Sequence, residues 1–205
     1  MDLRAAFRRL RRDPGLAAMI DRIGPLGLSP ARERTPFDYL LRAIVYQQLS
    51  GKAASTILGR VREIYSPGRP TPAKVLHTPA TVLRAAGLSN GKTAAVLDLA
   101  SHAARRRLPG PARLRRLTPQ QVIDRLTRVR GVGPWTAQML LIFYLGHPDI
   151  LPLKDLAIRK GFARVSGRRS LPGEAAIARH GARWRPYRSI ASWYLWRASE
   201  LPPDR

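Results

Sequence analysis

The sequence predicts an all-α protein of two helical lobes that flank a cleft, and three observations lead to this fold class. Apolar residues recur at helical spacing through most of the chain, and no segment shows the alternation expected of a strand. Short breaks rich in Gly and Pro, at Ser66–Pro72 and Pro109–Pro111, separate the helical segments without forming a long linker. Thr-Pro pairs stand before apolar patterns, as expected where Thr caps a helix and Pro occupies its first position. These pairs are Thr35–Pro36, Thr71–Pro72, Thr78–Pro79 and Thr118–Pro119.

Stripes of apolar residues predict the individual helices in chain order. We expect residues 1–205 to form one unit of two lobes, the first over about 35–115 and the second over 116–205 with the N-terminal helices. Apolar stripes run through Phe37–Ile44, Ala53–Ile64 (with Ser50 as the helix cap) and Val122–Val129. Further helices are expected over residues 3–12, 14–22, 91–106, 134–145, 155–165, 173–181 and 187–199.

The charge of the chain points to a polyanionic partner. There are 37 Lys and Arg against 13 Asp and Glu, which gives a net charge of +24. Such an imbalance favours nucleic acid as the partner, ahead of a membrane surface. A genome biased toward Arg codons is the alternative explanation, but it accounts for Arg in place of Lys and not for so few acids.

Several classes of site and location are excluded by what the sequence lacks. The absence of Cys excludes disulfides, thiolate zinc sites, thiol nucleophiles and cysteine-ligated iron–sulfur clusters. The four His are scattered, so no divalent catalytic metal is predicted. The N-terminus lacks the apolar core of a secretion signal, and the longest apolar run, Met139–Leu145, is too short to span a bilayer. We therefore expect a cytoplasmic protein without a membrane partner.

A glycine turn between two helices predicts a binding site for an anion. Val122–Val129 is one helix, Gly131–Gly133 is a tight turn, and Pro134 starts the next helix. The two glycines let a ligand approach the backbone, and the turn amides and the positive end of the following helix favour negative charge. With Arg130 beside it, the turn is interpreted as a helix–hairpin–helix that binds a DNA phosphate without reading sequence. The alternative is an ordinary helical corner in which Gly relieves crowding.

Five motifs in a fixed order cover about residues 35–196. In this order they resemble the helix–hairpin–helix DNA glycosylase superfamily, and they are most similar to 3-methyladenine DNA glycosylase II and its shorter, all-helical relatives. The motifs are Phe37–Leu40 with Ile44–Ser50 and Ala53–Ala54; Ala86–Ser89 with Lys92; Gly131–Ala137; Leu151–Gly161 (L-P-x-x-D-x-x-x-R-K-G); and Arg183–Ser189.

The resemblance places Asp155 at the position of the family's catalytic acid. Release of a base from deoxyribose develops oxocarbenium character on the sugar, and a fixed carboxylate stabilises this charge and orients the attacking water. An alkylated purine is already cationic and leaves readily. The alternative for Asp155 is a helix cap or a partner of Arg159. Asp149, in the loop before it, is interpreted as structural.

The same resemblance predicts a monofunctional enzyme. Lyase-type members of the superfamily carry a nucleophilic Lys two residues after the second hairpin glycine, and this chain has Trp135 there. Without that amine no Schiff base forms, so the product is an abasic site. Lys154, next to Asp155, is not at the nucleophile position.

Aromatic residues are expected to hold the flipped, cationic base. Trp135 and Tyr187 match the family's pocket positions. Trp184 and Tyr46 are further pocket residues for which a core position is the alternative. Met139 stands where the bacterial enzyme II has a Tyr, which predicts a less aromatic pocket.

The Gln-Gln-Leu turn after the first-lobe helix is expected to fill the gap left by the flipped nucleotide. Gln48 is the predicted wedge and Leu49 is its apolar rival; a Gln pair that caps a helix is the alternative. Lys52, at the start of the next helix, is expected to contact a phosphate. By resemblance, the backbone carbonyls of Thr127, Val129 and Val132 are expected to hold a sodium or potassium ion, and no other cofactor is expected.

Together these features predict a monofunctional DNA glycosylase that removes alkylated purines of the 3-methyladenine and 7-methylguanine type from double-stranded DNA. The protein is expected to act in base excision repair as a monomer, associated with a bacterial-type nucleoid. The alternatives are a glycosylase for another lesion, such as uracil, and a non-catalytic helix–hairpin–helix DNA-binding module.

Overall fold

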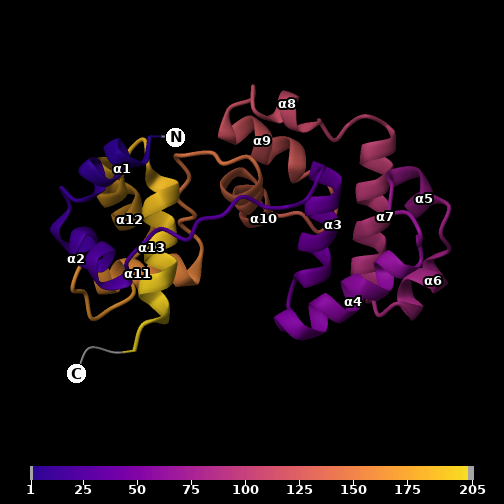
Figure 1. Cartoon of the computed structure of the whole chain (residues 1–205), viewed down its shortest axis with the longest axis horizontal. Coiled ribbons are helices and arrows are strands. Elements are labelled where there is room, and N and C mark those ends of the chain that lie inside the picture. Colours follow the sequence, from indigo (N-terminus) through magenta and orange to yellow (C-terminus); the bar gives the residue numbers. More distant parts are fainter. Residues whose placement is uncertain (1, 203–205) are drawn as a thin grey trace. The chain divides into compact units, whose positions relative to one another are not determined.

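The computed structural model describes residues 2–202, and every regular element within this range is a helix, which confirms the all-α fold class. The chain divides into two compact units (Figure 1). The central unit comprises Ala31–Leu145, and the terminal unit combines the chain up to Pro30 with the chain from Gly146 onward. In the described part of the chain, no helix is long and apolar enough to cross a membrane.

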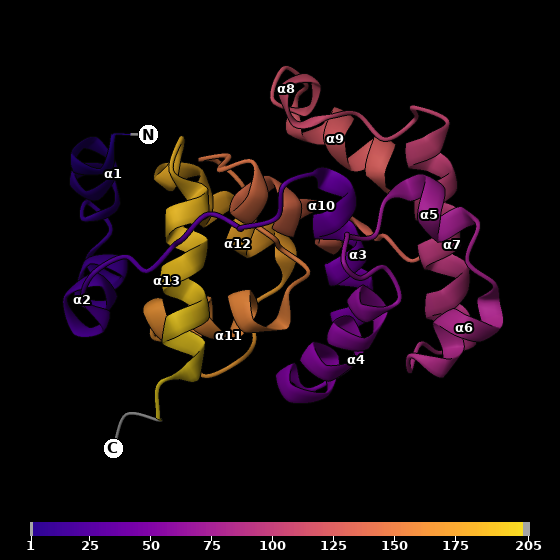
Figure 2. The ribbon, with the colours of Figure 1, turned by 45° about the vertical axis from the view of Figure 1, so that its right-hand side comes forward.

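The central unit is organised around α7, against which α3, α5 and α6 pack (Figures 1 and 2). Leu40 and Ile44 of α3 and Val96 and Leu99 of α7 are fully buried, so these two helices share the core. The elements of this unit are α3 (Pro36–Tyr46), α4 (Gly51–Glu63), α5 (Pro72–Leu76), α6 (Ala80–Ala85), α7 (Asn90–Ala104), α8 (Pro111–Leu114), α9 (Pro119–Leu126), α10 (Pro134–Met139) and the π-helix η1 (Leu140–Tyr144).

Three of the four Thr-Pro pairs start a helix as predicted. The side chains of Thr35, Thr71 and Thr118 each accept a hydrogen bond from the amide three residues later, and Pro occupies the first helical turn. The prediction is wrong for Thr78, because α6 begins at Ala80 with Pro79 as a cap that makes no side-chain bond. The Thr78 hydroxyl instead donates to the Lys74 carbonyl at 2.8 Å, so it closes the end of α5.

The helix expected over residues 134–145 changes character midway. Helix α10 ends at Met139, and the chain continues as η1, after which the Leu145 amide donates to the Leu140 carbonyl at 2.9 Å. This five-residue spacing widens the turn relative to an α-helix. Leu140 and Leu141 stay buried through the change, so the apolar run remains in the core.

The terminal unit joins the two ends of the chain. Helix α13 packs against α11 and α2, so the N-terminal helices contact the C-terminal ones as expected. Gly161 of α11 allows a close approach, because a Cβ at this position would collide with the backbone carbonyl of Leu195. The elements are α1 (Leu3–Leu10), α2 (Pro14–Ile23), α11 (Leu156–Val165), α12 (Glu174–Gly181), the 3-10 helix η2 (Ala182–Trp184) and α13 (Arg188–Glu200).

The division between the units differs from the expected lobe boundary at residue 116. Residues 116–145, which include the Gly131–Gly133 turn, belong to the central unit. Two bonds between distant residues hold them there. The Gln47 side-chain amide donates to the Gly131 carbonyl at 2.8 Å, and the Arg130 backbone amide donates to the Asp98 carboxylate at 2.8 Å.

A buried carboxylate ties α2 to the C-terminal half of the terminal unit. Asp13 is 4% exposed and accepts hydrogen bonds from the Leu16 amide at 3.3 Å and the Trp184 indole N–H at 2.8 Å. The Nε2 of His180 lies 2.6 Å from the same carboxylate. Burial alone would raise the pKa of Asp13, but the bonds from His180, Trp184 and Leu16 outweigh it, so the pKa is lowered.

Replacement of Asp13 by Asn is expected to lower the free energy of unfolding by about 1–3 kcal/mol at pH 7, because donors in the interior lose an ionised acceptor. Since the folded-state pKa of Asp13 is lowered, its contribution is fully present above about pH 4 and is lost as the pH falls through the folded pKa. Urea unfolding of the wild type and of Asp13→Asn between pH 7 and pH 3 should therefore show that the difference in their free energies of unfolding becomes smaller as the pH falls.

Asp21→Asn is the matched control, since the Asp21 carboxylate pairs with Arg11 at the surface and is 63% exposed. We expect this change to alter stability by less than about 0.5 kcal/mol. Equal losses in the two variants, or a difference that does not shrink below pH 4, would contradict the role assigned to Asp13.

Candidate active site and nucleic-acid interface

The hairpin between α9 and α10 is fitted closely against α7. Gly131 has a φ of +76°, and a Cβ on it would lie 3.0 Å from the Cβ of Ala95. Both the backbone conformation and the neighbour therefore require Gly at this position. Gly133, which caps α10, has a negative φ and open space around it, so its Gly is not required by crowding within the protein.

The amides of the hairpin are not equally available to a ligand. The Arg130 amide is taken by Asp98, and the Val132 amide donates to the Val129 carbonyl at 3.0 Å. Because its amide is already bonded and its apolar side chain is buried, Val132 has no donor to offer a phosphate. Within residues 2–202 the amides of the exposed Gly131 and Gly133 have no protein acceptor. The predicted phosphate site thus narrows to these two amides and the exposed Arg130 side chain.

The carbonyls expected to hold a monovalent ion belong to one hollow. Thr127, Val129 and Val132 all line it, together with Asp98. The Val129 carbonyl already accepts the Val132 amide but retains a second lone pair. No cluster of three or more His, Cys, Asp or Glu suited to a metal occurs in the described part of the chain.

The predicted wedge lies at the tip of a strained turn. Gln48 has a φ of +57°, in the left-handed region, and its side chain is exposed. Leu49 is 39% exposed, and Ser50 caps α4 by accepting the Ala53 amide at 3.3 Å. Lys52, in the first turn of α4, is exposed as expected for a phosphate contact.

Two residues that the sequence patterns left without a role position this turn. The Gln47 amide reaches the Gly131 carbonyl, so the turn and the hairpin are bonded directly. The Lys92 ammonium donates at 2.6 Å to the carbonyl of Val45, which lies in the last turn of α3. Burial lowers the pKa of Lys92. The Gln-Gln pair in the sequence could have drawn attention to Gln47, but nothing in the sequence identifies the Gly131 carbonyl as its hydrogen-bond acceptor.

Asp155 is held rigidly at the start of α11 in the terminal unit. Its Oδ1 accepts the amides of Ala157 at 2.8 Å and Ile158 at 3.0 Å, which makes Asp155 the helix cap. The cap alternative is therefore correct, and it is compatible with catalysis because it fixes the carboxylate. Arg159 is not the partner, since its Nε donates to the Pro172 carbonyl at 3.0 Å.

Asp149 has the structural role predicted for it. Its carboxylate accepts two bonds from the Arg188 guanidinium, at 2.6 and 2.9 Å, and lies 3.8 Å from Arg185. Burial would raise the pKa of Asp149, but the bonds and charge of Arg188 outweigh it and lower the pKa. This pair joins the loop before Asp155 to the start of α13.

The expected base-pocket residues lie in different environments. In the central unit, Trp135 is 49% exposed on the first turn of α10, and the Arg42 guanidinium lies 4.4 Å from the Tyr46 ring centre. Met139 is only 8% exposed and belongs to the core. In the terminal unit, Tyr187 is half-buried before α13. Trp184 is a correction: it is fully buried and bonded to Asp13, so its core alternative holds and no ring face is open to a base.

Comparison with known families and proteins agrees with these features. Residues 41–186 match the HhH-GPD superfamily of base excision DNA repair proteins. The chain is 34% identical to DNA-3-methyladenine glycosylase 1 of Schizosaccharomyces pombe over 170 residues, which cover 82% of this chain and 75% of the relative. It is 28% identical to the alkylbase DNA glycosidase-like protein mag2 of the same yeast, over 90% of this chain and 88% of the relative.

Solved structures show the same fold. The S. pombe 3-methyladenine DNA glycosylase Mag1, in complex with abasic DNA, superposes with a TM-score of 0.84 at 32% identity and covers 96% of this chain and 97% of its own. The DNA-3-methyladenine glycosidase of Bacillus halodurans gives a TM-score of 0.85 at 32% identity, with 94% and 87% covered. The chain therefore belongs to the HhH-GPD superfamily of base excision DNA repair proteins.

Proposed function

We propose that this protein is a monofunctional DNA glycosylase that hydrolyses the N-glycosidic bond of alkylated purines in double-stranded DNA. The observation that carries the proposal is Asp155, fixed as the cap of α11 within the segment that matches the family's acid motif. Support comes from relatives named 3-methyladenine glycosylases and from a structural neighbour solved with abasic DNA, the product of this reaction.

Asp155 acts where positive charge develops on the sugar. As the base leaves, the deoxyribose gains oxocarbenium character, and a carboxylate held in place stabilises it without reorganisation. The amides of Ala157 and Ile158 hold Oδ1, which sets the plane of the carboxylate before the substrate arrives. The same carboxylate orients or deprotonates the attacking water. A cationic N3- or N7-alkylated purine is a good leaving group, so one acid is sufficient.

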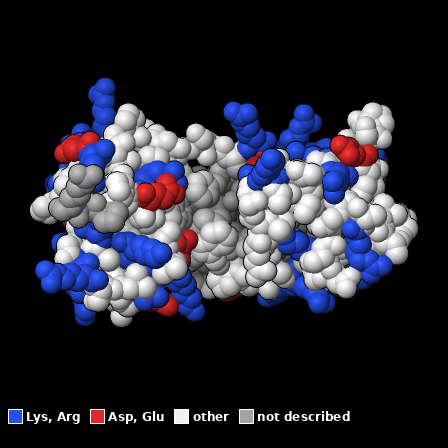
Figure 3. Space-filling model, turned by 90° about the horizontal axis from the view of Figure 1, so that it is seen from below, with Lys and Arg blue, Asp and Glu red and all other residues white. Residues whose placement is uncertain are grey.

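DNA is bound through its phosphates by the central unit. The amides of Gly131 and Gly133 and the side chains of Arg130 and Lys52 supply donors. An alkali ion on the carbonyls of residues 127, 129 and 132 would add positive charge beside them. On the face seen in Figure 3, Lys and Arg side chains are spread widely and acids are few. Phosphate contacts of this kind make the affinity fall steeply with salt.

The target nucleotide leaves the base stack, and its base is held by aromatic side chains. In the central unit, the half-exposed Trp135 offers ring surface to a cationic base, whereas Met139 offers little. In the terminal unit, the half-buried Tyr187 is the aromatic residue proposed for the same role. Because position 135 carries Trp rather than Lys, no Schiff base forms and the abasic strand is left intact. The protein works as a monomer, as a cytoplasmic enzyme of the nucleoid.

Asp155→Asn is expected to lower the rate of base release from methylated DNA by at least about 100-fold, because the charge is lost. Asn is also a good helix cap, so the melting temperature and DNA affinity should stay close to those of the wild type. The measurement is single-turnover release of 3-methyladenine and 7-methylguanine.

The control is Asp124→Asn, an exposed carboxylate that accepts a hydrogen bond from the Gln120 amide, one turn earlier on α9, at 2.7 Å. It should leave the rate unchanged. Equal rates for Asp155→Asn and the wild type would remove Asp155 from its role. Release of uracil in place of methylated purines would keep the role of Asp155 and change the lesion class.

Gln48→Ala is expected to reduce nucleotide flipping more than Leu49→Ala does, because Gln48 occupies the tip of the left-handed turn. Flipping can be followed by the fluorescence of 2-aminopurine placed beside the lesion. We expect a clear loss of the fluorescence change with Gln48→Ala, because no side chain then fills the place of the flipped base, and little change with Leu49→Ala. The reverse order would make Leu49 the wedge.

Gln47→Ala is expected to slow flipping and base release by roughly five- to tenfold, the effect of one hydrogen bond of about 1–1.5 kcal/mol. Because the bond to Gly131 orients the turn without contacting DNA, affinity for undamaged duplex should change little. Gln120→Ala, on the exposed face of α9, is the control. A parallel loss of undamaged-duplex affinity would show that Gln47 acts as a DNA contact instead.

A further inference from the structure

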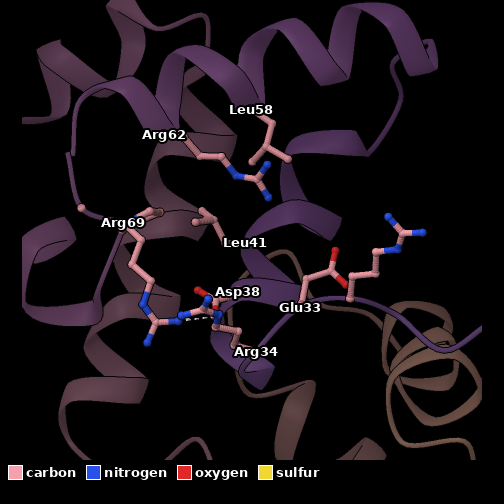
Figure 4. Close-up of a pocket in the computed structure, with 10 residues that line it drawn as sticks. Glu33, Arg34, Asp38, Leu41, Leu58, Arg62 and Arg69 are labelled. Atoms are coloured by element: carbon pink, nitrogen blue, oxygen red, sulfur yellow. Dashed lines mark hydrogen bonds and ion pairs between the residues drawn. The ribbon is translucent and has the colours of Figure 1, made fainter. Parts of the chain in front are cut away.

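A basic cavity of about 230 Å³ lies in the central unit, at the start of α3 (Figure 4). The segment before α3 supplies Arg32 and Arg34, α4 supplies Arg62, and the loop after α4 supplies Arg69. Leu41 and Leu58, both nearly fully buried, form an apolar part of its lining. The cavity thus combines an apolar lining with four guanidinium groups.

The two acids of the cavity pair with only one of these four arginines. Asp38 accepts the Thr35 hydroxyl at 2.7 Å and pairs with Arg69 at 3.3 Å. Glu33 pairs with Arg42, at 3.5 Å, on the following helix.

Arg32, Arg34 and Arg62 form no ion pair with a carboxylate within residues 2–202, and Figure 4 shows the Arg62 side chain extending from α4 beside Leu58. Three uncompensated cations around one hollow repel one another, so an anion placed among them is stabilised.

The segment that carries Arg32 and Arg34 is fixed to the body of the unit. The Ala31 amide donates to the Phe143 carbonyl at 2.8 Å, and the Tyr144 hydroxyl donates to the Arg34 carbonyl at 3.3 Å. Both bonds come from η1. The backbone of these arginines is therefore positioned in advance, which lowers the entropy lost when a ligand binds.

A second, more apolar cavity of about 210 Å³ adjoins the first. The two share Asp38, Arg69 and Pro70, and the second is lined further by Phe37 and Leu108. A ligand with a phosphate at one end and a flat, largely apolar group at the other matches this pair of chambers in both chemistry and size.

We propose that these adjoining chambers, the Arg34–Arg62 chamber and the Phe37–Leu108 chamber, bind a terminal phosphate monoester of the nucleotide class. The phosphate lies between the guanidinium groups of Arg34 and Arg62, and the base lies against Phe37 and Pro70. A terminal phosphate enters a recess, whereas the phosphodiester of a continuous strand passes across it.

The site is separate from the hairpin surface. It lies at the first residues of α3, while Gln47, which bonds to the hairpin, follows the last residue of the same helix. An α-helix of this length, 11 residues, spans about 16 Å. The proposal therefore does not depend on the glycosylase activity, and its test needs no damaged DNA.

The test is calorimetric titration of deoxyadenosine 5′-monophosphate and of deoxyadenosine into the full chain and into Arg34→Gln/Arg62→Gln. We expect the nucleotide to bind the wild type and the Kd to rise at least about tenfold in the double variant. Arg34→Lys/Arg62→Lys keeps the charge but loses the two-pronged donor, so its Kd should fall between the two. Deoxyadenosine should bind at least tenfold more weakly than the nucleotide.

Arg105→Gln/Arg113→Gln is the matched control, because it removes the same charge from exposed positions of the same unit outside both chambers. Its Kd should stay within twofold of the wild type. An equal loss in this control, equal binding of deoxyadenosine, or no binding of the nucleotide would overturn the proposal. Thermal melting confirms that each variant is folded, and base release should be unchanged in the Arg34/Arg62 variants.

Two duplexes distinguish the sources of the phosphate. One carries a 5′-phosphate at its end and the other a 5′-hydroxyl. If the Arg34/Arg62 variant loses affinity for the free nucleotide and treats both duplexes as the wild type does, the ligand is a free nucleotide. If it also loses the preference for the phosphorylated duplex, the phosphate of a strand end is accepted too. Both results support the site.

Discussion

The functional surface of the central unit depends on how closely the hairpin lies against α7. Gly131 has a positive φ, and a Cβ at this position would lie only 3.0 Å from the Cβ of Ala95, so a side chain here would strain the turn and crowd α7. The Asp98 carboxylate then holds the hairpin from α7, and the Gln47 amide holds it from the turn after α3. With its backbone fixed on both sides, the hairpin presents the Gly131 and Gly133 amides in a set direction, which is the requirement for a site that recognises a phosphate by geometry.

Asp155 is both the cap of α11 and the proposed catalytic acid. The cap of a helix has an extended backbone, so its side chain lies where loop and helix meet and remains partly accessible. The capping bonds also fix the side-chain rotamer, which a surface carboxylate would otherwise sample freely. The same two hydrogen bonds therefore stabilise the start of α11 and orient the Asp155 carboxylate. Few residue types cap a helix start, and among the common ones Asp alone brings the negative charge that suits an oxocarbenium ion.

Local chemistry made most helix starts and the hairpin predictable, because a Thr cap or a Gly turn is decided by residues close in sequence. The prediction that Asp155 is the catalytic acid likewise rests on its motif. The hydrogen-bond partners of these residues could not be predicted, because they are distant in the sequence. Gln47 and Gly131 are 84 positions apart, and Asp13 and Trp184 are 171 apart. Periodicity does not show which Trp is buried. Trp184 was therefore predicted as a pocket residue from its motif, whereas the structure places it in the core.

The scarcity of acids has a structural consequence that the net charge alone does not reveal. Asp13 holds α2 to the C-terminal half, Asp98 holds the hairpin, Asp149 binds Arg188, and Asp155 caps α11. These four carboxylates make bonds that hold the fold together, so they are less available to the other arginines on the surface. Affinity for a polyanion falls with every phosphate contact that a neighbouring carboxylate opposes. The positive charge of the surface therefore depends on the scarcity of nearby acids as well as on the number of arginines.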